Sequence, residues 1–106
     1  MQSLQEIVGA AQRGDVGAFS ILYDHYFERV YRYVMSRVRE SHEAEDLTQE
    51  IFLKVFRGLS SFRFHGPPFG AWLFRIARNA VVDWVRTRNR LGDVTDLEAV
   101  RNITSG

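Results

Sequence analysis

The sequence predicts an all-α fold, a compact bundle of about four helices. Apolar residues recur at steps of three and four along most of the chain, and no segment of useful length alternates with a period of two. The 106 residues, of which 45% are hydrophobic and 25% charged, are typical of a soluble globular domain with its own core. We therefore expect residues 1–90 to form one domain and residues 91–106 to form an acidic linker or tail.

The first two helices are expected at about Leu4–Gln12 and Val16–Arg39. The first is apolar on one side and ends near Gly14, and Asp15 is a residue type that caps the start of the next helix. The second carries one continuous apolar stripe, as expected for the long central helix of a bundle. The stripe consists of Phe19, Leu22, Tyr23, Tyr26, Val30, Tyr33, Val34 and Val38.

The third helix is expected at about His42–Gly58 and the fourth at about Pro68–Arg88. Ser41 is expected to cap the third helix with its hydroxyl, and the carboxylates that follow favour the positive end of a helix. Pro67 and Pro68 suit the first turn of the fourth helix, because their fixed φ is already helical. The inward row of the third helix is Leu47, Ile51, Val55 and Leu59, and the apolar side of the fourth is Trp72, Leu73, Ile76, Ala77, Ala80 and Trp84.

The segment from Ser61 to Arg90 is the most informative part of the chain. It holds six arginines, six aromatic side chains and one acidic residue around a Gly-Pro-Pro break. Arginine binds phosphate through a planar fork, and aromatic rings offer faces on which unpaired bases stack. These residues favour a nucleic-acid partner, and a separated strand more than an intact duplex, over the alternative of a solvated helix face.

Charge is segregated along the chain although the formal net charge is only +1. Residues 1–60 carry seven basic and nine acidic side chains, residues 61–90 carry six and one, and residues 91–106 carry one and three. This asymmetry predicts a basic face for a polyanion and a separate acidic surface for another partner.

Catalysis and metal binding have no visible basis in the sequence. Cysteine is absent, His25, His42 and His65 are isolated, and no glycine-rich phosphate loop occurs. Glu43, Asp46 and Glu50 share one helix face that could hold a hard cation, but a solvated or partner-binding face is the better interpretation. We expect no enzyme activity, no cofactor and no metal.

No apolar run is long enough to cross a bilayer, and the N-terminus lacks the pattern of a signal peptide. We therefore expect a cytoplasmic protein without membrane insertion. Two other functional classes remain open at this point: a duplex-binding protein of helix-turn-helix type, and a helical protein-interaction module that does not touch DNA. Preference for double-stranded DNA would favour the first, and tight binding only to a protein the second.

Several linked motifs follow one another along the second half of the chain. They are Ala44 to Phe56 (AEDLTQEIFLKVF), Ser61-Phe62-Arg63, Phe69 to Asn79 (FGAWLFRIARN), and Asp83 with Arg86. In this order they resemble region 2 of bacterial RNA polymerase sigma factors of the extracytoplasmic-function group of the sigma-70 family, and the resemblance covers about Asp15 to Arg90.

The resemblance implies two binding surfaces. The segment matching Asp46 to Arg57 would dock on the β′ clamp helices of the RNA polymerase core, and the segment matching Arg63 to Asn79 would read the minus-ten promoter element. There, a base flipped out of the non-template strand would be captured after the third helix, so the domain would recognise and melt the promoter during transcription initiation. An anti-sigma factor is a further possible partner.

Residue by residue, the implied core-binding set is Asp46, Leu47, Gln49, Glu50, Leu53 and Lys54. The implied DNA-binding set is Phe62, Arg63, Phe64, His65, Phe69, Arg75, Arg78, Asn79, Arg86, Arg88 and Arg90. Within it, Phe62, Phe64 and Phe69 would line or support the flipped-base pocket, Asn79 would bond base edges, and the arginines would hold phosphates. Trp72 would either act as a wedge at the duplex edge or pack in the core.

A complete factor of this group continues into a domain whose helix-turn-helix reads the minus-thirty-five element, and nothing in this sequence corresponds to it. We therefore expect the chain to be an isolated or truncated domain with the start of the linker. The loop Phe64 to Pro68 varies widely in the family, so no promoter sequence preference follows from the resemblance.

Overall fold

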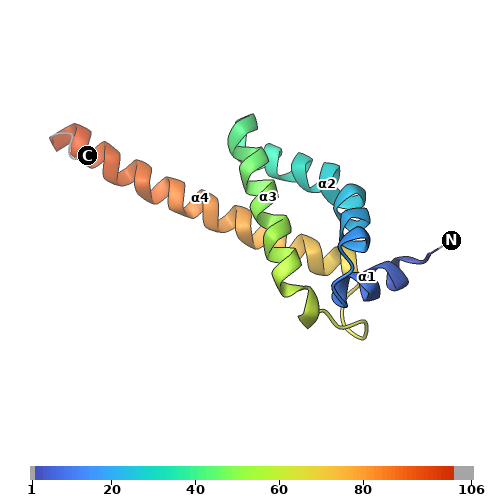
Figure 1. Ribbon diagram of the computed structural model, residues 1–106. Coiled ribbons are helices and arrows are strands. Elements are labelled where there is room, and N and C mark those ends of the chain that lie inside the picture. Colours follow the sequence, from blue (N-terminus) through green and yellow to red (C-terminus); the bar gives the residue numbers. More distant parts are fainter. Residues whose placement is uncertain (1, 102–106) are drawn as a thin grey trace.

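The computed structural model describes residues 2–101 of the chain, with side chains described as far as residue 91. It confirms the all-α prediction with four α-helices (Figure 1). The elements are α1 (Leu4–Gln12), α2 (Val16–Val38), α3 (Ser41–Gly58), a short 3-10 helix η1 (Leu59–Ser61) and α4 (Phe69–Arg101).

Helix α2 is the centre of the bundle, because it packs against α1, α3 and α4. Its predicted stripe is buried at Leu22, Tyr26, Val30, Val34 and Val38, whereas Phe19, Tyr23 and Tyr33 are half-buried. The predicted inward row of α3 is buried throughout. The fully buried side chains of the core come from all four helices and include Val8, Leu22, Ile51 and Leu73.

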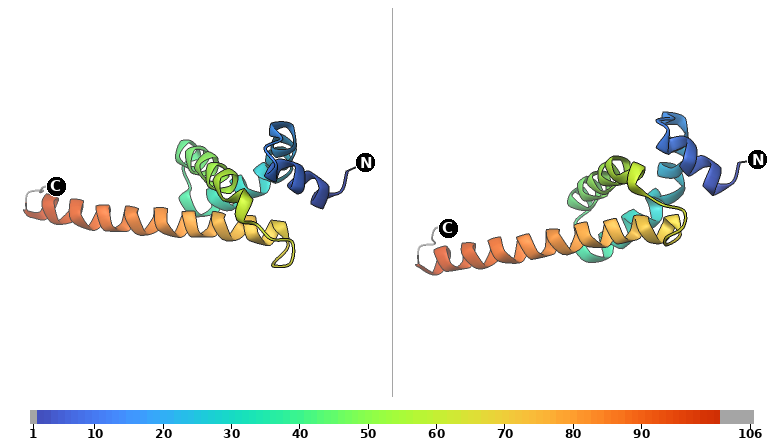
Figure 2. Two further views of the ribbon diagram at one scale, coloured as in Figure 1. Left: turned by 60° about the horizontal axis from the view of Figure 1, so that its bottom comes forward. Right: turned by 90° about the horizontal axis from the view of Figure 1, so that it is seen from below.

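Helix α4 continues through Arg101, beyond the end expected near Arg88. The expected linker therefore begins as helix: the stretch after Arg88 contains no proline, and a single glycine such as Gly92 weakens a helix by about 1 kcal/mol without ending it. The remaining residues of the expected tail, 102–106, lie outside the described residues. In all views α4 projects well past α2 and α3 (Figures 1 and 2), which gives the molecule a long axis of 61 Å. Neither α4 nor any other helix in residues 2–101 has the length and apolar character needed to cross a membrane.

Side-chain caps fix the starts of α1, α2 and α3, and one of these caps differs from the prediction. Asp15 caps α2 as predicted, since its Oδ1 accepts the Ala18 N–H at 3.1 Å. Ser3 and Glu6 form a reciprocal capping box at α1. The predicted cap Ser41 is wrong, because it is already the first residue of α3 and Glu40 is the cap.

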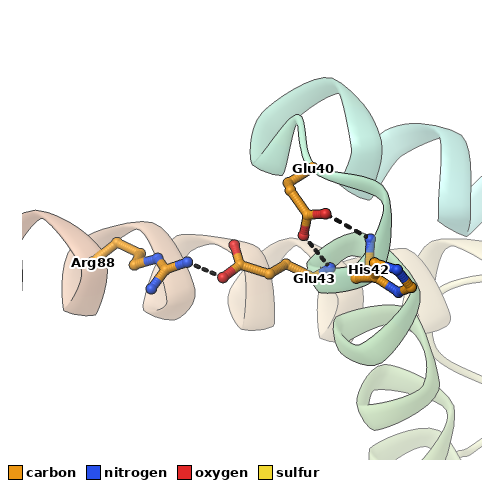
Figure 3. A network of polar contacts seen from close by, with 4 residues as sticks. All are labelled: Glu40, His42, Glu43 and Arg88. Carbon is orange, nitrogen blue, oxygen red and sulfur yellow. Dashed lines mark hydrogen bonds and ion pairs between the residues drawn. The ribbon is translucent and has the colours of Figure 1, made fainter.

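The Glu40 carboxylate accepts the Glu43 N–H at 2.8 Å and the His42 N–H at 3.2 Å (Figure 3). These two backbone hydrogen bonds, that from Glu43 first, lower the pKa of Glu40 below its usual value. Serine is a preferred N-cap residue and glutamate is not, so the general preference predicted Ser41 in place of its neighbour Glu40.

Replacing Glu40 by Ala is expected to lower the melting temperature at about pH 7 and to have less effect near pH 3. Because the folded-state pKa of Glu40 is lowered, its contribution is present above the unfolded-state pKa and is lost as pH falls through the folded-state value. Thermal unfolding followed by circular dichroism at both pH values measures this effect. Ser41→Ala is the control, and a larger decrease for it than for Glu40→Ala would contradict the assignment of the cap.

Candidate nucleic-acid interface

The loop between η1 and α4, residues 62–68, is anchored by an aromatic cluster. Phe62 is 3% exposed, and its ring lies 5.3 Å from that of Phe69 and 5.4 Å from that of Trp72 between centroids. Phe69 and Trp72 are buried as well. Of the residues implied for the base pocket, Phe62 and Phe69 therefore support the loop from inside, and Trp72 packs in the core.

Phe64 is the aromatic residue of this loop that reaches the surface. Its side chain is 41% exposed, and its ring meets Phe62 edge to face at 5.1 Å. Arg63 folds back on the loop, where its Nη1 donates to the Ser60 carbonyl at 2.9 Å and to the Phe62 carbonyl at 3.2 Å. His65 is exposed. The loop thus exposes one aromatic ring, that of Phe64, while the buried ring of Phe62 anchors the loop to the core.

A basic groove runs between α2 and α4. One part is lined by Tyr33, Pro67, Phe74, Arg75 and Arg78, and the adjoining part by Tyr33, Arg37, Arg78, Val82, Arg86 and Asn89. Because Tyr33 and Arg78 belong to both parts, we treat them as one feature, the α2–α4 groove. The lining residues include four arginines and no carboxylate among the residues that the structure describes.

Tyr33 and Arg37 are functional candidates that sequence reasoning missed. Tyr33 lies in the apolar stripe of α2 and so was expected in the core, but it is only half-buried. The guanidinium of Arg37, one turn further along, lies 5.7 Å from the Tyr33 ring centroid. The signal that could have found them is this arginine one turn after a tyrosine at the edge of an apolar stripe.

The other arginines of α4 in the implied DNA-binding set differ in whether they already form an ion pair. Arg86 lies 3.4 Å from Asp83, and Arg88 pairs with Glu43 of α3 (Figure 3) while lying over the Trp84 ring. Arg90 and Asn79 are exposed but do not line the α2–α4 groove.

Arg75 and Arg78 form no salt bridge with any residue whose side chain is described. Within the groove they are therefore available to an anion without losing an existing ion pair.

The candidate core-binding residues all lie on α3, and none of them lines the α2–α4 groove. Asp46, Gln49, Glu50, Leu53 and Lys54 are exposed, and Glu50 pairs with Lys54 at 3.8 Å. In contrast, the Leu47 side chain is 5% exposed, so it packs in the core and does not face a partner.

An apolar groove adjoins this face, between α2 and α3. We call it the α2–α3 groove; it is lined by Phe19, Tyr23, Gln49, Phe52, Leu53 and Phe56. Leu53 and Phe56 are each about half exposed, so the groove presents two large apolar side chains together, and contiguous exposed apolar surface is a common feature of binding sites. Phe19 and Phe56 were missed because their helical spacing is that of core residues. Among the described residues no cluster of His, Asp and Glu is suited to a metal ion.

Residues 22–91 match the family model described as Sigma-70 region 2. The chain is 45% identical over 92 residues to the ECF RNA polymerase sigma factor BldN of Streptomyces coelicolor, covering 87% of this chain and 35% of the relative. It is 36% identical over 104 residues to the ECF RNA polymerase sigma-E factor of Escherichia coli K12, covering 96% of this chain and 53% of the relative. The chain thus spans between about a third and half of the length of these curated relatives.

Two solved structures are similar in fold and sequence. An engineered region 2 of sigmaE in complex with GTAAAA has a TM-score of 0.76 and 34% identity, covering 84% of this chain and 92% of the other. The RsbN–BldN complex has a TM-score of 0.69 and 44% identity, covering 92% of this chain and 66% of the other. The chain belongs to the sigma-70 family, as a region 2 domain of the extracytoplasmic-function group.

The burial of the two phenylalanines predicts a clear difference between their variants. Phe62→Ala is expected to lower the free energy of unfolding by about 3–5 kcal/mol, as for a buried phenylalanine, whereas Phe64→Ala is expected to lower it by less than about 1 kcal/mol. Urea unfolding of both variants measures this difference. Equal losses would show that Phe64 belongs to the core and is not a free face.

Proposed function

We propose that this domain binds the RNA polymerase core through α3 and captures the non-template strand of the promoter minus-ten element. It acts as a specificity subunit in transcription initiation and performs no catalysis. The observation that carries the proposal is the α2–α4 groove, which joins four arginines and two aromatic rings beside a loop that exposes Phe64. Three of these arginines, Arg37, Arg75 and Arg78, form no salt bridge with any side chain that the structure describes.

The α2–α4 groove suits the backbone of a single strand. Arg75, Arg78 and Arg86 lie about one helical turn or two apart on α4, and Arg37 faces them from α2. Arginine forks bind phosphates, and Tyr33 and Phe74 between them offer rings to unpaired bases. No carboxylate belongs to the described lining, and Asp83, which lies beside the groove, is paired with Arg86 at 3.4 Å. The arginines therefore outnumber the negative charge that a phosphate would meet there.

Phe64 supplies the stacking face for a flipped base. Extruding a base from a duplex costs a few kcal/mol, and stacking on an aromatic ring returns about 1–3 kcal/mol per base. Because the pocket accepts only an extruded base, it selects the open state of the promoter and melting needs no ATP. Phe62 and Phe69 keep Phe64 at the surface by holding the loop, and the solved complex of a similar region 2 with GTAAAA supports this kind of ligand.

The α3 surface suits a protein partner. Exposed carboxylates at Asp46 and Glu50 flank the apolar α2–α3 groove with its half-exposed Leu53 and Phe56. An apolar centre with a charged rim is typical of protein interfaces, and we assign it to the β′ clamp helices. The complex of BldN with RsbN supports a second protein partner for such a domain, and we propose that an anti-sigma factor competes for this chain.

Replacing Arg78 by Ala is expected to flatten the salt dependence of binding to a minus-ten single strand. Each lost phosphate contact reduces the slope of log K against log salt concentration by about 0.7 for a single strand, because fewer counterions are released. Fluorescence anisotropy at a series of salt concentrations measures the slope. Arg32→Ala, an exposed arginine of α2 outside the groove, is the control and keeps the wild-type slope.

If the Arg78→Ala variant had the same salt slope as the Arg32→Ala control, this would contradict the proposal that phosphates bind in the α2–α4 groove. Tighter binding to duplex than to single strand would favour a duplex-binding protein instead. Absence of binding to either form, together with tight binding to a protein, would favour an interaction module.

Replacing Glu50 by Arg is expected to abolish co-purification with core RNA polymerase and to leave oligonucleotide affinity within about twofold, since a reversed charge on α3 does not reach the α2–α4 groove. Affinity capture of core enzyme and anisotropy measure the two effects. Glu45→Arg, which adds the same charge on another side of α3, is the matched control. Loss of both activities in a folded Glu50 variant would refute two separate surfaces.

A further inference from the structure

A second pocket lies beside Phe64 and shares no lining residue with the α2–α4 groove. Pro67 of the loop lines the groove, whereas Phe64 lines this pocket together with Gln5, Glu6 and Gly9 of α1 and with Arg13, the residue that caps the end of α1. Helix α1 precedes the part of the chain that matches the family model, which begins at residue 22. We infer that α1 forms the second wall of the base-capture site and that Arg13 contacts the captured nucleotide; this rests on the proposed function.

The first step is that α1 is tied rigidly to the loop. The side-chain amide of Gln12 donates to the carbonyls of Leu59 and Phe62, both at 3.0 Å. These carbonyls lie at the start of η1 and at the residue that begins the loop. One amide nitrogen has two N–H donors, and here each has its own acceptor. The width of the pocket is therefore set by Gln12, which acts as a positioning residue.

The second step is the free face of Phe64. The Phe62 ring meets the Phe64 ring edge to face at an interplanar angle of 82°, and Phe64 remains 41% exposed in the pocket wall. A ring held by an edge contact has a face available for a stacked base. A nucleotide stacked there lies between the loop and α1.

The third step is the position of Arg13. Its Nη1 lies 3.4 Å from where a side-chain Cβ at Gly9 would be, so the guanidinium lies back along α1 at the edge of the pocket. Arg13 forms no salt bridge with any residue whose side chain is described. Glu6, the acidic residue of the pocket, accepts the Ser3 N–H at 2.9 Å in the α1 capping box. The unpaired guanidinium next to an aromatic face is the combination that binds one unstacked nucleotide through its phosphate and its base.

The test is anisotropy with the full chain and labelled minus-ten single strands in which each nucleotide in turn lacks its base. For the intact strand, Arg13→Ala is expected to lower affinity about 10- to 150-fold, as for a lost charge-assisted hydrogen bond, and Arg32→Ala less than about twofold. For the strand lacking the captured base, Arg13→Ala is expected to lower affinity less than about threefold. Removing the base and removing the guanidinium both break the binding of the same nucleotide, so their effects are not additive.

Gln12→Ala provides a second measurement. It is expected to weaken binding of the intact strand while leaving the salt slope unchanged, since the amide is neutral and touches protein only. Circular dichroism confirms that each variant is folded at the assay temperature.

The outcomes separate this inference from the proposed function. If Phe64→Ala weakens binding but Arg13→Ala matches Arg32→Ala, or if the Arg13 effect is equal for every strand, α1 is not part of the site and the groove still stands. If the wild-type chain binds no single strand, both the proposed function and this inference fail.

Discussion

The packing of Phe62 against Phe69 and Trp72 is the constraint on which the rest of the site depends. These three buried rings fix the loop to the start of α4, and Phe69 also lies 5.7 Å from the Tyr26 ring of α2. Trp72 also packs beside Gly58 of α3, because its ring atom Cζ2 lies 3.6 Å, an ordinary van der Waals distance, from where a Cβ would be. The loop can then expose Phe64 because its neighbours, and not Phe64 itself, supply the hydrophobic anchor.

The same architecture keeps the two charged surfaces apart. The α2–α4 groove, which holds the arginines, and the α2–α3 groove share no lining residue. Outside both grooves, Arg88 of α4 pairs with Glu43 near the start of α3 (Figure 3). This exposed ion pair contributes little stability on its own, but it joins the part of α4 beyond the bundle to the helix that we assign to the polymerase. Under the proposed function, a strand and a protein partner would therefore bind to separate surfaces of the domain.

The sequence predicted those parts of the fold that depend on periodicity. Most of the stripe of α2 and all of the predicted inward row are buried as expected. Apolar residues at every third or fourth position lie on one face of a helix, and that face packs in the core. The cap at Glu40 and the end of α4 were not predicted, because both depend on weak local preferences. Burial of Phe62 and Phe69 was not predictable, since a motif shows which residues matter but not which of them face inward. Periodicity placed Leu47 in the inward row, and only the family resemblance put it on the partner surface.

The sequence predicted the site residues of α4 but missed several residues that other elements contribute. Arginines that interrupt an apolar helix are visible in a sequence, and Arg75, Arg78 and Arg86 all line the groove. Tyr33 and Arg37 had only a weak local signal, an arginine one turn after a tyrosine. The residues of α1 reach the site only through tertiary packing, so no local pattern marks them. Phe19 and Phe56 were missed for the same reason, because exposure of an aromatic residue depends on how far apart two helices lie.

The central claim is that one strand binds along α4 and the loop while α3 remains free. The most direct measurement is a backbone amide NMR titration of the chain with a minus-ten single strand. The account predicts that chemical shifts change for residues 62–68, for Arg13, and for Arg75, Arg78 and Asn89, while those of Asp46, Glu50 and Leu53 stay constant. Shifts centred on α3, with the loop and α4 unchanged, would contradict it.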